Sequence, residues 1–183
     1  MESAIQRATR ARTAAWLAQS QTAPDSVQQH AYAMIDMIAQ FSPAVRVLRD
    51  HGTWYYRPGT AVPPTDYVQQ QPRECFANAF RFDVNTVYAG YYSTQDLQFA
   101  FFTDHAWNMR DDGVVIDTTL PHGTAAWYFG LKVPRALVMQ LAGHAAQSPG
   151  GLNYLDAIRF QEPAQRERSL DALRAANPLN RQP

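Results

Sequence analysis

The chain has few of the residues that mark several common classes of protein. Cys75 is the only cysteine among 183 residues, which excludes an internal disulfide and a metal site built from several cysteines. The histidines other than His105 show no metal-binding spacing, so neither a metal nor another cofactor is expected. One free thiol fits a reducing compartment such as the cytoplasm, although it is also compatible with export of a protein that needs no disulfide.

Charge and hydropathy argue against further classes. The formal net charge is zero, which gives no electrostatic basis for binding nucleic acid or an anionic membrane surface. No apolar run approaches the roughly 18 to 20 residues of a membrane span, and the arginine-containing N-terminus has no apolar signal segment. With 46% hydrophobic and 17% charged residues, we expect one globular, cytoplasmic domain over residues 1–183, without nucleic-acid or membrane partners.

Hydrophobic periodicity predicts an α+β fold. Helical spacing over residues 2–20, and again from Asp25 or Ser26 to Ser42, predicts a helical cover over residues 1–45. The polar segment 164–183 is expected to be a frayed tail, with a possible helix over 169–176. Strands are expected over 86–92, 97–109, 114–119 and 126–133, a helix over 135–146, and a short helix or strand over 154–160.

A short helix is predicted to carry the cysteine. The spacing of Cys75, Phe76, Ala79 and Phe80 is helical, and Pro72 suits the first helical position. Cys75 then lies in the first turn, where the positive end of the helix dipole favours a thiolate.

The segment 105–119 is predicted to be a β-hairpin with a histidine on one strand and an aspartate on the other. Asp111-Asp112-Gly113 is a strong signal for a three-residue loop. In that register Asp117 faces Trp107, so that His105, Trp107 and Asp117 project from one side of the hairpin. A two-residue loop would place His105 and Asp117 on opposite faces.

Cysteine, histidine and aspartate in this order can activate a thiol. An imidazolium at His105 would pair with the Cys75 thiolate, and Asp117 would fix the imidazole tautomer. The developing oxyanion needs donors, for which the Cys75 backbone N–H and side chains of the glutamine run are candidates. The candidate glutamines are Gln69, Gln70 and Gln71.

Structural roles compete with each of these assignments. A lone cysteine in an apolar chain is most often a small buried hydrophobe. Trp107 and Asn78 are candidate substrate-binding residues. Trp107 more simply packs on the cysteine helix, and Asn78 could bond either to the site or to a loop.

The pattern resembles the transglutaminase-like branch of the papain-like cysteine enzyme superfamily. Cys75 opening a helix, His105-Ala106-Trp107 on a strand and Asp117-Thr118 on the next one match that branch over about residues 69–133. The resemblance implies a papain/transglutaminase-like core, with an antiparallel sheet packed on the cysteine helix and a Cys-His-Asp triad. Arylamine N-acetyltransferases share the order of the three residues, but their glycine pair before the cysteine is missing here.

The expected function is therefore cysteine-dependent acyl transfer, as a thiol protease, amidase, deamidase or transglutaminase-like enzyme acting on a protein, peptide or amide. Two alternatives compete with this expectation. One is a binding or structural module that keeps the fold without turnover. The other is an accessory protein of a phage or mobile element, in which Cys75 is structural.

Overall fold

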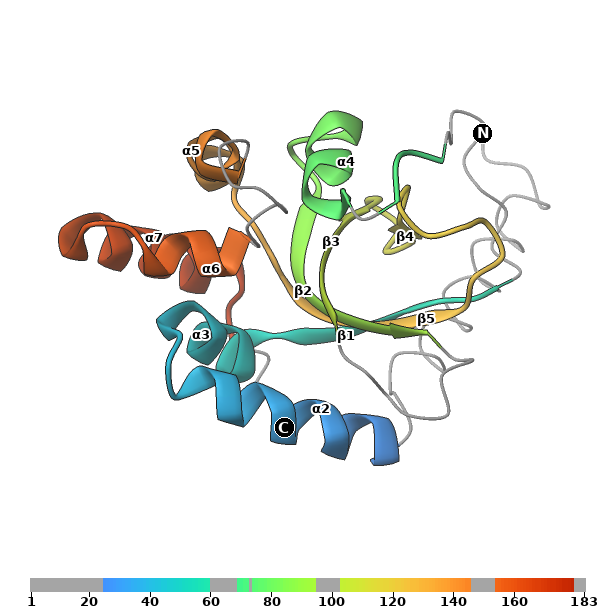
Figure 1. Cartoon of the computed structure of the whole chain (residues 1–183), viewed down its shortest axis with the longest axis horizontal. Coiled ribbons are helices and arrows are strands. Elements are labelled where there is room, and N and C mark those ends of the chain that lie inside the picture. The colour runs from blue at the N-terminus through green and yellow to red at the C-terminus, as the bar shows by residue number, and fades with distance from the viewer. Residues whose placement is uncertain (1–24, 60–68, 73, 95–102, 146–153, 180–183) are drawn as a thin grey trace, which may run out of the picture.

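The computed structural model describes residues 25–59, 69–72, 74–94, 103–145 and 154–179, and all statements below concern these residues. The predicted helix over 2–20 lies outside them, as does the beginning of the predicted strand 97–109. Figure 1 shows a strongly bent sheet with helices gathered around it. The predicted α+β class is confirmed.

Five strands form one antiparallel sheet in the order β1-β5-β2-β3-β4. Six helices accompany it within the described residues. The helices are α2 (Asp25–Ala39), α3 (Pro43–His51), α4 (Cys75–Phe82), α5 (Arg135–Ala145), α6 (Tyr154–Arg159) and α7 (Pro163–Ala176). The strands are β1 (Thr53–Arg57), β2 (Val87–Thr94), β3 (Thr103–Met109), β4 (Val115–Ile116) and β5 (Ala126–Lys132).

Curling of the sheet gives it two unlike faces. β1 and β4 stand at opposite ends of the strand order, yet they contact each other. Because side chains alternate along a strand, the register assigns His105, Trp107, Tyr128 and Gly130 to the face enclosed by the curl, here called the concave face. Ala89, Tyr91, Phe129 and Leu131 project from the opposite face, here called the helix-covered face.

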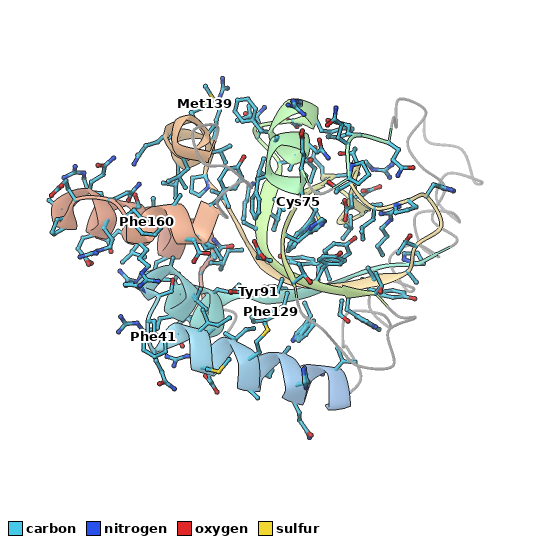
Figure 2. All side chains as sticks on the ribbon, in the orientation of Figure 1. Phe41, Cys75, Tyr91, Phe129, Met139 and Phe160 are labelled. Atoms are coloured by element: carbon cyan, nitrogen blue, oxygen red, sulfur yellow. The ribbon has the colours of Figure 1, made fainter. Side chains whose placement is uncertain are left out.

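The helix-covered face holds the main apolar core. Figure 1 shows α2 and α3 beneath the sheet, and in Figure 2 Tyr91 and Phe129 lie on the side of the sheet that faces them. The Phe129 ring packs edge-on against Tyr32 of α2, with 5.6 Å between the ring centroids. Leu155 and Leu173 bring α6 and α7 into the same core.

The concave face holds a second, mainly aromatic cluster. Trp107, Met109, Val115, Ala126 and Tyr128 are buried there, and Tyr55, Tyr88 and Tyr92 pack against them. Gly130 makes room for the largest ring: a Cβ at this position would lie 2.2 Å from Cη2 of Trp107. Trp107 therefore packs within the aromatic cluster, whereas the sequence favoured packing on the cysteine helix.

Helix α3 opens at Pro43, and the Ser42 side chain caps it by accepting the Val45 N–H at 3.4 Å. Two sequence-based expectations for the helices need correction. Pro72 is not the first helical residue, because α4 begins at Cys75 after Glu74 as N-cap. A helix was expected in the polar tail only over 169–176, but α7 already begins at Pro163, and it buries Leu170 and Leu173. The apolar stripe of α7 is thin, which is why its sequence looked like a solvated tail.

Within the described residues, every helix is too short or too polar to cross a lipid bilayer.

Candidate functional site

Cys75 lies at the start of α4 and is largely buried, with 8% of its surface exposed. Figure 2 shows it beside α4, toward the middle of the molecule. Two polar contacts fix this helix. The Asn108 side-chain amide donates to the carbonyl of Ala79 at 3.1 Å, and the Tyr154 hydroxyl donates to the carbonyl of Phe76 at 2.9 Å. The first turn of an α-helix leaves backbone N–H groups without intrahelical partners, and Cys75 is in that turn.

The hairpin of β3 and β4 has the predicted three-residue loop. Arg110 N–H donates to the carbonyl of Val114 at 3.0 Å, and Gly113 N–H donates back to Arg110 at 2.9 Å. Gly113 has φ of 81°, the left-handed conformation that this loop requires and that glycine adopts without strain. The strands pair Asn108 with Ile116. This register confirms the prediction that His105 and Asp117 lie on the same side.

The His105 and Asp117 side chains are in direct contact. Nε2 of His105 donates to Oδ2 of Asp117 at 2.7 Å. Both residues are almost completely buried, with exposed fractions of 3% and 1%. The ladder between β3 and β4 stops at Ile116, so within the described residues the edge of β3 beside His105 carries no paired strand. Asp117, the first residue after this ladder, therefore reaches the His105 ring without a strand between them.

Asp117 ends β4 earlier than the sequence suggested. The expected strand reached 119, but Oδ1 of Asp117 accepts the N–H groups of Thr119 at 2.9 Å and Leu120 at 3.2 Å. An aspartate that bonds to N–H groups two and three residues ahead turns its own backbone and takes those donors out of any ladder. The turn thus points the carboxylate at His105.

A second side chain shares the carboxylate oxygen that binds His105. The Tyr128 hydroxyl donates to Oδ2 of Asp117 at 2.9 Å. With His105 and the two N–H groups of the turn, Asp117 accepts four hydrogen bonds in a completely buried position. Four donors compensate for the desolvation that would otherwise expel a carboxylate from the interior.

The electrostatics favour a charged pair of His105 and Asp117. Burial opposes the imidazolium, but the charge of Asp117 and its hydrogen bond, together with a hydrogen bond and charge from Cys75, raise the pKa of His105 from 6.5 to about 10. Burial likewise opposes the carboxylate. The charge and hydrogen bond of His105, with the Thr119 N–H and the Tyr128 hydroxyl, nevertheless hold the pKa of Asp117 below its ordinary value.

The imidazole is bonded to Asp117 through Nε2. Nδ1 is therefore the nitrogen left for Cys75, whose side chain is near enough to help raise the pKa of His105. An imidazole placed in this way can accept the thiol proton at Nδ1 while the carboxylate stabilises the resulting positive charge.

The glutamine segment passes beside this group. Gln70 N–H donates to the carbonyl of Thr118 at 2.8 Å, which aligns the segment with the turn after Asp117. The Asn78 amide nitrogen donates to the carbonyl of Gln71 at 2.8 Å and to Oγ1 of Thr119 at 3.0 Å. Gln69 and Gln71 are exposed and Gln70 is half-buried. Asn78 is completely buried, and its bonds tie α4 to the two loops, the second of the two roles that the sequence left open for it.

Sequence reasoning did not identify Tyr128 and Arg57 as parts of the site. The Tyr92 ring is tilted over the His105 ring, with 4.3 Å between their centroids. Arg57 is buried, and its Nη1 donates to the carbonyl of Asp117 at 3.2 Å. The only available signal was the alternation of residues in β1, β2 and β5, which gives the face of each side chain but not which strands are neighbours.

Comparisons of the chain with protein-family models, curated proteins and solved structures find no match. Within the described residues, no group of histidine, cysteine, aspartate and glutamate side chains could hold a metal ion.

Proposed function

We propose that the protein is a cysteine-dependent acyl-transfer enzyme that uses Cys75, His105 and Asp117 as its triad. One observation carries the proposal: the buried His105 imidazole is hydrogen-bonded to the Asp117 carboxylate, and the only thiol of the chain is near enough to help raise the pKa of His105. The resemblance of the pattern to transglutaminase-like enzymes supports the same assignment.

In the proposed reaction His105 holds the thiol proton at Nδ1, so that the reacting pair is a Cys75 thiolate and a His105 imidazolium. The Cys75 sulfur then forms a bond to the carbonyl carbon of a protein, peptide or amide substrate, and the carbonyl oxygen becomes an oxyanion. When the C–N bond breaks, the leaving amine or ammonia takes the proton from His105, and a thioester remains on Cys75. Water or a second amine, deprotonated by His105, attacks the thioester and restores the thiol.

The oxyanion requires donors close to the sulfur. The Cys75 N–H belongs to the first turn of α4, so it is not used within the helix. The side-chain amides of Gln69, Gln70 and Gln71 are further candidates, because the bonds of Gln70 and Gln71 keep this segment beside α4 and the Asp117 turn. We propose the N–H of Cys75 as the first donor and one of these amides as the second.

One observation favours a second candidate function. Only 8% of the Cys75 surface is exposed, which suits a cysteine that packs in the core of a non-catalytic binding or structural module. A buried structural thiol is inert toward alkylating reagents, whereas a thiol activated by His105 reacts faster than an ordinary one.

The rate of alkylation by iodoacetamide separates the two functions. Because Cys75 is the only cysteine, every adduct in the intact mass reports this one site. At pH 7 we expect the folded protein to react at least about tenfold faster than the urea-unfolded chain, since an unperturbed thiol is only a few per cent ionised at this pH. His105→Ala should remove this advantage.

His30→Ala is the matched control, because His30 is exposed on α2 and should leave the rate unchanged. Circular dichroism checks that each variant is folded. Alkylation of the folded protein no faster than that of the unfolded chain, with no change on removing His105, would contradict the enzyme and favour the non-catalytic module.

A further inference from the structure

The Asp117 carboxylate has a second side-chain partner that the proposed reaction does not yet use. Tyr128 lies on β5 with no exposed surface, and its hydroxyl donates to the same oxygen, Oδ2, that binds His105. Two donors on one oxygen compete for its negative charge. The more charge the hydroxyl draws, the less remains to hold a proton on His105.

Arg57 supports the hydroxyl from the far side. Arg57 pairs with Ala126, so that Tyr128, two residues further along β5, is its diagonal neighbour on the concave face. The guanidinium is held in place by the carbonyls of Asp117 and Pro121, each at 3.2 Å. Burial raises the pKa of Tyr128, and the positive charge of Arg57 opposes this rise. A cation beside the hydroxyl makes its proton a stronger donor toward Asp117.

The charges of Arg57, Asp117 and His105 explain why a competing donor on the carboxylate is useful. Arg57 and Asp117 carry opposite charges, so proton transfer from Cys75 to His105 leaves the group neutral as a whole. Without a competing donor, a buried carboxylate 2.7 Å from the ring would bind the imidazolium very firmly. The proposed reaction needs the imidazolium to form, but it also needs the same group to release its proton to the leaving amine.

We infer that Tyr128, polarised by Arg57, is a positioning residue that weakens the hold of Asp117 on the His105 proton and so keeps the imidazolium acidic enough to protonate the leaving group. This inference rests on the proposed function and deepens it. It assigns a role to Tyr128 and Arg57, which lie beyond Asp117 as seen from His105. Tyr128 touches neither substrate nor thiol and acts only through the carboxylate.

Tyr128→Phe tests the inference, because it removes the hydroxyl and keeps the ring in the aromatic cluster. The His105 ring protons are followed by NMR from pH 5 to 11 and assigned by comparison with His105→Ala. We expect the His105 titration to move to higher pH by about one pH unit, the value of one hydrogen bond to a charged group. Loss of a merely structural contact would lower the melting temperature without moving this titration.

Two comparisons make the result specific. Tyr91→Phe removes a tyrosine hydroxyl from the helix-covered face, and it should leave the His105 titration where it is. In an Asp117→Asn background no carboxylate remains, so adding Tyr128→Phe should produce no further movement. A His105 titration that is unchanged in Tyr128→Phe, or that moves equally with and without Asp117, would overturn the inference.

The outcome is independent of the test of the proposed function. If Cys75 alkylation is fast and depends on His105 but Tyr128→Phe does not move the titration, only the role of Tyr128 is overturned. If alkylation is slow and independent of His105, the proposed reaction fails, and with it the role assigned to Tyr128, whatever the titrations show.

Discussion

The two faces of the sheet bury their side chains in different ways. The helix-covered face is mainly apolar, with residues such as Ala89, Phe129 and Leu131 in its core, and Asn108 is a polar residue buried there against α4. The concave face surrounds three buried polar groups, Arg57, His105 and Asp117, with aromatic rings. Consecutive residues of β5 belong to the two faces. Gly130 lies against the Trp107 ring, whereas the Leu131 side chain is part of the main core.

This difference separates what the chain needs for folding from what a reaction needs. Apolar burial at about 25 cal/mol per Å² stabilises the fold whatever the detailed order of the residues. Buried charges add little to stability even when they are paired, and often less than apolar side chains of the same size would. The polar group on the concave face therefore adds little to stability, in keeping with the proposed function, and we expect changes on the two faces to have different consequences.

The largest expected effect on stability comes from the helix-covered face. Leu131 is completely buried, and Leu131→Ala should lower the free energy of unfolding by roughly 2–5 kcal/mol, because it removes apolar contacts and leaves a cavity. Urea denaturation measures the loss. The protein that remains folded should still alkylate at Cys75 at the unmodified rate. Slower alkylation in the fully folded variant would show that the two faces are not separable.

The neighbouring change on the concave face should have a smaller effect on stability and a larger one on the thiol. In Gly130→Ala the new Cβ would meet the Trp107 ring, which lies nearly parallel to the His105 ring with 6.5 Å between their centroids. We expect a loss of roughly 1–3 kcal/mol from overpacking. Displacement of the rings should also slow Cys75 alkylation several-fold. An unchanged alkylation rate in a folded Gly130→Ala protein would contradict the expected functional difference between the two faces.

The hairpin could be predicted because its information is local. Asp111-Asp112-Gly113 specifies a three-residue loop, the loop specifies the register, and the register places His105 and Asp117 on one side. The cysteine helix was predictable for the same reason, since the spacing of its apolar residues is contained within one short segment. Only the helix start was wrong, where Pro72 and Cys75 were both possible first residues.

The positions of Arg57 and Tyr128 beside Asp117 could not be predicted, because they depend on the order of the strands in the sheet. Arg57 reaches Tyr128 only because β1 pairs with β5, and Tyr128 reaches Asp117 only because the sheet curls. Neither pairing has a local sequence signal. The extent of α7 was also missed, since Leu170 and Leu173 become core residues only once α6 and the sheet are in place.

The most direct test of the link between Cys75, His105 and Asp117 is the titration of the His105 ring by NMR in the unmodified protein. With Asp117 bonded to the ring and Cys75 near it, His105 should keep its proton well above its ordinary pKa of 6.5 and lose it near pH 10. Asp117→Asn should bring the titration down, because it removes the charge that stabilises the imidazolium. A ring that titrates near pH 6.5 and does not respond to Asp117→Asn would contradict the account.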